Sequence, residues 1–448
     1  MFFLLPIYTR YLGVYEYGII ESMTVFSSIL TIIFSLGIHN SVYRLYYDYE
    51  SENAKKQLFG TIGFFVFLFS IIISLFLFIG KDFTGLIFKN IPFDPFFKFA
   101  ILTTLLTNLA ELPKAYLIIN EKALQYTIIS IVQFLLNTGI ALYFLIILKS
   151  DASGLLKGQL LSSLVMSPFF IVFSLKHFKY KPDLKMLKSS LVFSIPALPT
   201  LLSAWILNLS DRIFIEHYIN PKALGVYSLG YKIASIIGFA FTAIDMSYMP
   251  LFFKLANSKN ESDLLKIKLL NRIYLSILLL LVFIVSLFSK EFIIILFSKD
   301  FFDSYKIIII VSFVFFLSQF CALISKNLSQ SKKIKQGMYI DLSAAVLNIC
   351  FNLLLIPHFG IYGAAWATLL SFLYSVIVYY FYSLKHTFFI DFNLNEMFIF
   401  LVTFLIILII IYSLNLSISI SMILKIVLTI IILIFYYLYF RFSFRKLI

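Results

Sequence analysis

The stretch that decides the fold class is Gln57–Gly80, which reads QLFGTIGFFVFLFSIIISLFLFIG. Its 24 residues contain no Asp, Glu, Lys or Arg. About 20 such residues in an α-helix cross the ~30 Å hydrocarbon core of a bilayer. The run is continuous and does not alternate between apolar and polar residues, as a membrane β-strand would. The stretch therefore predicts a transmembrane α-helix.

The whole chain has the same apolar character. Of its 448 residues, 61% are hydrophobic and 13% are charged, and the mean hydropathy is +0.98. An ordinary soluble domain carries about 25% charged residues, and no soluble core could hide this much apolar surface. The composition excludes a soluble globular fold, and the continuous apolar runs exclude an outer-membrane barrel. Together they predict an all-α polytopic membrane protein.

Fourteen apolar segments follow one another along the chain. The first is a stub at residues 1–8, and the others are long enough to cross a membrane. The connections between segments, such as the one at 176–189, are too short to fold as a domain. The thirteen full-length segments lie at 17–37, 57–80, 96–119, 126–148, 154–175, 190–209, 224–248, 269–287, 304–324, 337–356, 360–384, 397–414 and 419–440.

Lys and Arg are distributed unevenly between the two sides of the membrane. The side with the connection between segments 2 and 3, every second connection after it and the C-terminus carries 23 of the 36. The opposite side carries 11 when residues near the span ends are counted with the adjacent side, and Lys232 and Lys425 lie deeper within spans. The richer side is expected to be cytoplasmic, which places both termini in the cytoplasm. Most of the net charge of +14 is then explained by topology rather than by nucleic-acid binding.

Two sequence motifs recur at nearly one offset. Gly18 and its neighbours are matched by Gly225, 207 residues later, and Gly154–Ser162 is matched by Gly363–Ser371 at an offset of 209. A block of six spans therefore occurs twice, and because six is even both copies have the same orientation. The predicted division is an N-terminal lobe of segments 1–6, a C-terminal lobe of segments 7–12 and two additional helices, at residues 1–180, 181–387 and 388–448.

The same offset makes the first segment incomplete. Subtracting 207 from the start of segment 7, near Ser189, places the start of segment 1 before Met1. We expect that about twenty residues of the first helix are missing, through truncation or a misplaced start codon. The alternative is a short N-terminal segment that lies in the membrane interface.

Motifs for hydrolysis or metal binding are not evident. The stretch Gly225–Lys232, GVYSLGYK, resembles a P-loop, but its Lys comes one residue late and is followed by Ile233 instead of Ser or Thr. The two cysteines and five histidines show no metal-ligand spacing. The sequence predicts no cofactor and no metal, so an ion gradient, the membrane potential or the substrate gradient would drive transport.

Ionisable residues at membrane depth are the candidate functional residues, because such groups are costly there. Four are cations: Arg10 and Arg212 end segments 1 and 7 on the outer side, Arg44 ends segment 2 on the inner side, and Lys232 lies inside segment 8. Each has an alternative explanation as an interface anchor or a local ion pair. A further cation, Lys425, is expected to extend its side chain to the interface.

The remaining candidates are acidic or amide residues and one more lysine. They could line a cavity or bind a coupling ion, and the alternatives are capped helix ends, an i,i+3 pair between Glu111 and Lys114, and interhelical hydrogen bonds of the asparagines. Pro113 is expected to kink the helix of segment 4. These candidates are Glu21, Lys114, Asp245, Asp341, Asn137 and Asn348. Because cations outnumber acids along the predicted repeat interface, the pattern favours an anionic, phosphate-bearing substrate.

Several motifs carry a family resemblance in their order and spacing. The chain resembles the polysaccharide-repeat flippases (O-antigen and capsule-type exporters) of the multidrug/oligosaccharidyl-lipid/polysaccharide exporter (MOP) superfamily. The motifs are LPIYTRYLG at 5–13 with EYG at 16–18, SIPALP at 194–199 with NLSDR at 208–212, LGVYSLGYK at 224–232 and GIYGAA at 360–365. The incomplete first helix is the departure from the family.

The resemblance implies twelve helices in two six-helix lobes around a central cavity, with two peripheral helices. It implies a bacterial inner-membrane flippase that moves an undecaprenyl-pyrophosphate-linked oligosaccharide to the outer leaflet by alternating access, for O-antigen, lipopolysaccharide or similar surface polysaccharide. By matching motifs, Arg10, Arg212, Lys232 and Arg44 would meet the pyrophosphate. A coupling ion (H⁺ or Na⁺), a glycan polymerase and glycosyltransferases are the expected partners.

Two other functions remain open from the residues alone. An ion-coupled multidrug extruder of the same superfamily would need buried acids for cationic drugs, and the excess of cations argues against it. A membrane glycan polymerase would be an enzyme and would need a long outer loop with catalytic basic residues. The outer connections here are short, so we expect a transporter and not an enzyme.

Overall fold

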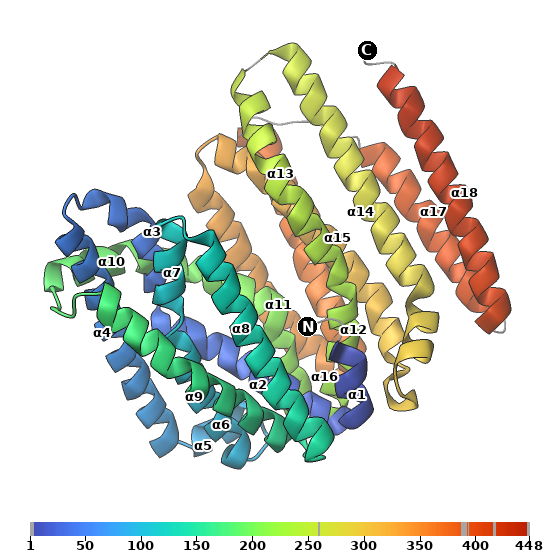
Figure 1. The fold of residues 1–448 in the computed structure, drawn as a ribbon. Helices are drawn as coiled ribbons and strands as arrows, with labels where there is room; N and C mark the ends of the chain where they lie inside the picture. Colours follow the sequence, from blue (N-terminus) through green and yellow to red (C-terminus); the bar gives the residue numbers. More distant parts are fainter. Residues whose placement is uncertain (1–3, 259, 387–391, 393, 415–417, 446–448) are drawn as a thin grey trace. The chain divides into compact units, whose positions relative to one another are not determined.

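The computed structural model describes residues 4–258, 260–386, 392, 394–414 and 418–445. Within these ranges the regular secondary structure is helical, with no strand. The chain forms two compact units: the first unit is Ile7–Gly225, and the second unit is Val226–Ile448 together with Met1–Pro6. The boundary falls 45 residues after the predicted end of the N-terminal lobe, inside a single helix, α12 (Figure 1). The predicted sequence repeat itself stays a prediction.

The first unit contains long helices separated by short helical turns. The predicted stub, at residues 1–8, overlaps α1, a helix of seven residues. In chain order the elements are α1 (Leu5–Tyr11), α2 (Val14–Ser35), η2 (Ile38–Ser41), α3 (Val42–Leu45), η3 (Tyr46–Asp48), α4 (Glu52–Ile79), α5 (Asp82–Ile87), η4 (Phe93–Phe97), α6 (Lys98–Asn108), α7 (Glu111–Ile119), α8 (Ala123–Leu142), η5 (Tyr143–Ile147), α9 (Ala152–His177), α10 (Leu184–Ser194), η6 (Ile195–Ala197) and α11 (Leu198–Tyr218).

The second unit is built from longer helices, and α17 and α18 lie beside α14 (Figure 1). Its elements, beginning with the helix shared by the two units, are α12 (Pro221–Ala234), α13 (Ile236–Ser258), α14 (Glu261–Leu296), η7 (Lys299–Phe301), α15 (Ser304–Gln330), α16 (Ile334–His386), α17 (Leu394–Ser413) and α18 (Ile418–Arg445).

Ten stretches among the described residues are helical, long and apolar enough to cross a membrane. Each of the thirteen full-length segments predicted above coincides with a helix or a pair of helices. The count of spanning helices is lower than thirteen for three reasons. The segment at 96–119 is divided between α6 and α7, and the segments at 337–356 and 360–384 are joined in α16. The segment at 397–414 contributes a shorter apolar helix, Met397–Ser413. The all-helical fold is confirmed, whereas the count of fourteen is not.

The break between α6 and α7 has a local cause. Pro113 has no amide hydrogen, so the carbonyl of Leu109 cannot receive the usual bond from four residues later, and the proline ring crowds that carbonyl. The amides of Leu109 and Ala110 instead bond to carbonyls three residues back, at 3.2 and 3.1 Å. The α-helix is therefore interrupted only at Leu109 and Ala110, whose backbone dihedrals remain in the right-handed helical region.

The chain of α16 reverses direction at Gly360. The φ of Gly360 is 59°, a left-handed value that glycine adopts without strain. Hydrogen bonds join the two arms of the hairpin: Tyr379 Oη donates to Asp341 Oδ1 at 2.9 Å, and Tyr374 Oη donates to Ser343 Oγ at 3.1 Å. Two predicted spans are thus antiparallel helices with almost no loop.

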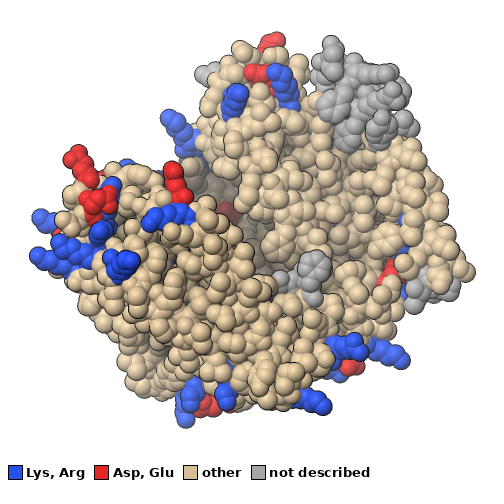
Figure 2. All heavy atoms as spheres, viewed as in Figure 1, with Lys and Arg blue, Asp and Glu red and all other residues tan. Residues whose placement is uncertain are grey.

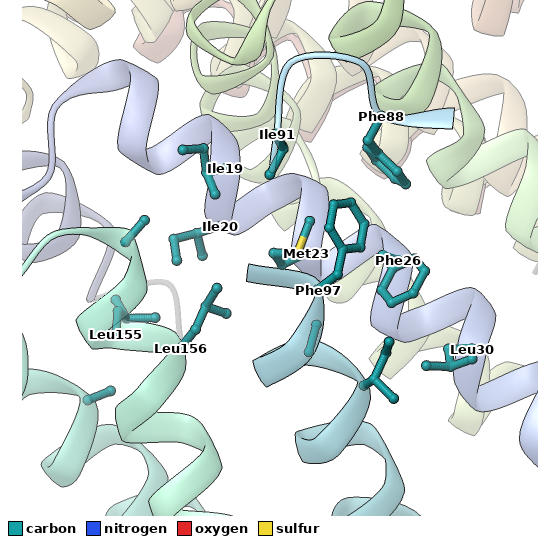
Figure 3. Close-up of a cluster of buried hydrophobic side chains, with 14 of the residues drawn as sticks. Ile19, Ile20, Met23, Phe26, Leu30, Phe88, Ile91, Phe97, Leu155 and Leu156 are labelled. Atoms are coloured by element: carbon teal, nitrogen blue, oxygen red, sulfur yellow. The ribbon is translucent and has the colours of Figure 1, made fainter. Parts of the chain in front are cut away.

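The core of the first unit lies between α2, α6 and α9. Figure 3 shows side chains of α2 pointing toward residues of η4 and α9. The rings of Phe26 and Phe97 meet edge to face with centroids 5.0 Å apart, a favoured aromatic geometry. The buried residues drawn include Ile19, Ile20, Met23, Phe26, Phe97, Leu155 and Leu156. This packing fixes α2, which carries the acid Glu21.

Candidate functional site

A charged cluster is buried in the first unit between α2 and α11. Glu21 on α2 is 2% exposed, and Asp211 and Arg212 on α11 are 1% and 3% exposed. The helix continues past the predicted end of segment 7 at residue 209 and ends only at Tyr218. Arg212 is therefore inside a helix rather than at its outer end, and ionisable groups in such a position are usually functional.

Arg212 bonds to groups of its own helix. One guanidinium nitrogen donates to Asp211 Oδ1 at 3.0 Å and to the carbonyl of Asn208 at 2.8 Å. The buried hydroxyl of Tyr17, on α2, has both Glu21 and Arg212 among its electrostatic neighbours. The fold thus brings two predicted residues, Glu21 and Arg212, into one neighbourhood. It also shows the local ion pair of Arg212 that the sequence left open as an alternative.

Glu216 was missed by the sequence reasoning. It is fully buried at the end of α11, and its carboxylate accepts the backbone amides of Lys89 and Asn90 at 2.9 and 2.7 Å. Asn90 Nδ2 donates back to the carbonyl of Glu216 at 2.7 Å. Glu216 therefore fixes the loop after α5, and its position one turn after Arg212 is the only signal that the sequence offers.

A second buried pair lies in the second unit between α13 and α15. Lys326 Nζ donates to Asp245 Oδ1 at 2.6 Å, and the side chain of Lys326 is 5% exposed. The sequence singled out Asp245 but not Lys326, because Lys326 falls two residues beyond the predicted end of its segment. The helix α15 continues to Gln330 and so carries this lysine inside the packed unit.

Aromatic and amide groups surround this pair. Lys326 Nζ lies 5.5 Å from the ring centroid of Tyr248 and 5.9 Å from that of Tyr274, within the range of cation–π attraction. The Tyr248 hydroxyl donates to Asn271 Oδ1, and Asn271 is 1% exposed. The site combines a paired acid and base with hydroxyl and amide groups, which are the parts of a proton or ion relay.

The remaining acidic and amide candidates have other hydrogen-bond environments. Asp341 is held by Tyr379, as described above, and Asn352 Nδ2 donates to Asn348 Oδ1 at 2.9 Å within α16. Asn137 on α8 makes no side-chain hydrogen bond within the described residues, so the interhelical bond predicted for it is not formed. The two predicted asparagines, Asn137 and Asn348, therefore occupy different environments.

The remaining predicted cations differ in exposure. Arg10 on α1 is exposed, and Lys232 on α12 is half-buried. Arg44 on α3 is exposed and pairs with Asp48 one turn later. Lys114 is half-buried on α7 and forms no ion pair with Glu111 within the described residues, contrary to the i,i+3 pairing considered above.

The expectation for Lys425 is wrong. Its side chain is 1% exposed, and Nζ lies 2.8 and 2.7 Å from the two carboxylate oxygens of Glu291 on α14. Ser421 donates to the same carboxylate at 2.8 Å, and Nζ is 4.9 Å from the ring centroid of Tyr412. A lysine with a partner at the same depth forms an ion pair there and does not extend to the interface.

A metal site is not formed by the described residues, among which no three His, Cys, Asp or Glu side chains are grouped to hold an ion. The charged groups are therefore arranged as ion pairs and hydrogen-bond clusters.

Comparisons with known proteins agree with this architecture. A family model described as "Polysaccharide biosynthesis protein" matches residues 7–306. A curated relative, Lsg locus putative protein 1 of Haemophilus influenzae, is 24% identical over 269 residues, which cover 58% of this chain. The match spans 63% of that relative's length, just under two thirds.

Two solved structures share the fold. The lipid II flippase MurJ in an inward closed conformation has a TM-score of 0.69 and 18% identity, over 96% of this chain and 94% of that one. An inward-facing multidrug resistance MATE family transporter of the MOP superfamily has a TM-score of 0.61 and 14% identity, over 85% and 88%. At these identities the likeness concerns the fold, and it confirms the predicted polytopic membrane architecture.

Proposed function

The chain belongs to the polysaccharide biosynthesis protein family, and on that premise we propose that it moves an undecaprenyl-pyrophosphate-linked oligosaccharide from the inner to the outer leaflet of the bacterial inner membrane. The family match over residues 7–306 carries the proposal. The likeness of fold to a structure named as a lipid II flippase supports it. In this proposal the protein is a transporter and not an enzyme, and both termini are cytoplasmic.

The pyrophosphate is the part of the substrate that the charged side chains would recognise. Phosphate oxygens accept strong, charge-assisted hydrogen bonds from Arg and Lys. The accessible Arg10 and the half-buried Lys232 are suited to the first contact. Arg212 would bind the substrate in a conformation that exchanges its bond to Asp211 for one to phosphate. Arg44, already paired with Asp48, is the weakest of the four candidates.

A reciprocal contact supports the proposed repeat. A Cβ on Gly18 would lie 1.8 Å from the carbonyl oxygen of Pro221, and a Cβ on Gly225 would lie 2.2 Å from that of Val14. The two glycines are 207 residues apart, and so are Val14 and Pro221. Gly225 is the counterpart of Gly18, and Val14 is the counterpart of Pro221. When one pair of residues and the pair of their counterparts make the same contact, the two elements are related by a two-fold axis. Lobes of the same orientation would produce this contact.

Coupling to an ion would use two half-buried acids. We propose Asp245, paired with Lys326, and Asp341, held by Tyr379, as the sites at which H⁺ or Na⁺ binding is linked to the conformational change. The likeness to a multidrug transporter favours drug extrusion as a second function. However, Asp245 is neutralised by Lys326 and so offers little attraction to a cationic drug.

The first experiment is deletion of the gene in its native host, followed by analysis of the lipid-linked intermediates and the surface glycan. Complete repeat units should accumulate on the inner leaflet while the surface glycan disappears. Unpolymerised single units on the outer leaflet would instead indicate a polymerase. An unchanged pool with reduced dye efflux would indicate a drug extruder.

Complementation with variants tests the residues. Arg212→Gln and Lys232→Gln are each expected to reduce surface glycan at least ten-fold (roughly 1.4 kcal/mol) at unchanged membrane abundance. The matched control is Lys222→Gln, an exposed lysine at the start of α12. If both test variants produced as much surface glycan as the wild type, recognition of the pyrophosphate by these cations would be ruled out. The family assignment would remain in place.

A further inference from the structure

A cavity in the first unit lies between α4, α6, α7 and α9, away from the charged cluster around Arg212. Its volume is about 330 Å³, at the lower end of the range for sites that bind small molecules. The lining is apolar, and the polar groups Ser70 and Asn108 close one end with a hydrogen bond of 3.3 Å. Leu109 and Pro113 contribute to the wall, so the break between α6 and α7 helps to form the cavity.

The cavity opens toward lipid. Several lining side chains are largely exposed, including Phe67 at 44% and Leu175 at 65%. The lining on α4 extends from Gly63 to Ser70, about 10 Å along the helix axis. A cavity of this kind within a membrane span is accessible to hydrocarbon chains.

A short segment covers the other end of the cavity. This strap, residues 178–183, connects α9 to α10 and contributes Phe178 and Tyr180 to the lining. Two hydrogen bonds tie it to α4: the amide of Lys179 donates to the carbonyl of Lys56 at 2.9 Å, and the side-chain Nε2 of Gln57 donates to the carbonyl of Lys181 at 2.9 Å.

Positive charge is concentrated on the strap and its flanks. Lys176, Lys179, Lys181, Lys185 and Lys188 are all exposed, and none forms an ion pair within the described residues. The one acid among them, Asp183, accepts the amides of Lys185 and Met186 and caps α10. Figure 2 shows Lys and Arg gathered near α10 on this part of the first unit, with Asp and Glu among them.

We propose that the cavity binds one anionic phospholipid, with an acyl chain against α4 and the phosphate at Lys179 and Lys181. The apolar lining suits the chain, and the strap holds the two lysines on either side of Tyr180, which lines the opening. Lysines at a membrane surface attract anionic headgroups. By the predicted topology the lipid comes from the cytoplasmic leaflet.

Gly63 leaves room for the chain. A Cβ at this position would lie 3.3 Å from Leu112 Cδ1 and 3.7 Å from the Tyr180 ring, so a larger side chain would occupy the cavity. Gly139 on α8 provides the matched control, because it is exposed and a Cβ there meets nothing within 4 Å.

The test is native mass spectrometry of the full chain in detergent with phosphatidylglycerol or phosphatidylcholine added. The wild type should retain one phosphatidylglycerol in preference to phosphatidylcholine. Gly63→Leu should lose this bound lipid, whereas Gly139→Leu should keep it. The double variant Lys179→Gln/Lys181→Gln should weaken phosphatidylglycerol binding roughly 30-fold and leave phosphatidylcholine binding unchanged.

Lysines elsewhere serve as the charge control. Lys332→Gln/Lys335→Gln, which changes exposed lysines just before and in the first turn of α16, should bind phosphatidylglycerol as the wild type does. Equal retention of the two lipids by the wild type, or undiminished binding by the strap variant, would overturn the proposal. The strap variant changes exposed residues, so it tests the site even where Gly63→Leu fails to fold.

Discussion

Arg212 in the first unit and the lysines Lys326 and Lys425 in the second are all buried cations, but they are neutralised in different ways. Arg212 bonds to its sequence neighbour Asp211 and to a carbonyl one turn earlier on α11. Lys326 bonds to Asp245, 81 positions earlier, and Lys425 bonds to Glu291, 134 positions earlier. The ion pair between Arg212 and Asp211 lies within one helix, whereas the two lysine pairs hold different helices together.

The location of the partner decides whether an ion pair can rearrange without a movement of helices. A pair formed within a helix can rearrange without separating helices, as a substrate-binding cation must. A pair between helices breaks only if the helices move apart, and breaking it leaves an uncompensated buried charge. On the proposed function Arg212 would bind the substrate, whereas Lys425 docks α18 against α14 and Lys326 links α13 to α15.

The strongest test of this division is the pair Glu291–Lys425. Because both side chains are almost fully buried, Glu291→Leu alone should lower the free energy of unfolding by about 3–5 kcal/mol. Thermal unfolding of the purified chain in detergent would measure the loss.

A variant that removes both charges of the ion pair is the control. Glu291→Leu/Lys425→Met removes both charges and should recover most of the stability, since an apolar replacement of a buried pair is often neutral. Equal destabilisation by the single and double variants would show that shape, and not charge, docks α18.

A smaller effect is expected at Asp245–Lys326, because the Asp245 side chain is 26% exposed. Asp245→Asn should cost about 1.5–3 kcal/mol, the range for a hydrogen bond to a charged group. A double-mutant cycle with Lys326→Met would measure the coupling energy of the two side chains. A coupling near zero would mean that the pair does not link α13 to α15.

The smallest effect is expected at a contact local in sequence, the cap of α9. Ser153 Oγ and the amides of Ser153 and Gly154 donate to Asp151 Oδ1. The hydrogen bond from the Ser153 side chain is the main reason that the pKa of Asp151 lies below its ordinary value of 3.8. Asp151→Ala should cost about 1 kcal/mol near neutral pH.

The sign of the pH dependence follows from the lowered pKa. The Asp151 cap contributes fully to the free energy of unfolding at pH values above the ordinary pKa of the carboxyl group. This contribution is lost as the pH falls through the pKa of Asp151 in the folded state. The stability difference between wild type and Asp151→Ala should therefore vanish in acid. A difference that persists at low pH would contradict the ionised cap.

Much of the fold could be predicted, because each long apolar run must satisfy its backbone polar groups internally when it crosses a membrane, and a helix does so. The helix break before Pro113 could also be predicted, since proline acts on its own turn. The joining of two spans at Gly360 could not, because the sequence does not reveal whether a glycine between apolar runs ends a helix or reverses it.

The candidate site was predictable in part. Glu21, Asp245 and Asp341 stand out as charges within apolar runs and Arg212 as a charge at the end of one, and the structure gives each of them buried or half-buried surroundings. Lys326 and Glu291 were not singled out because they lie just beyond the predicted ends of their spans. Helices that extend past the apolar run carry such residues into the packed interior.

The sequence by itself determined that this chain is a polytopic helical membrane protein and which charged residues lie within its apolar segments, because length, hydropathy and position are properties of the linear chain. Only the tertiary structure decided which of those charges are neutralised, and by what. Glu291 and Lys425 are 134 positions apart, and their contact depends on how α14 and α18 pack. Helix packing is a sum of many weak side-chain contacts, and no single motif in the sequence records it.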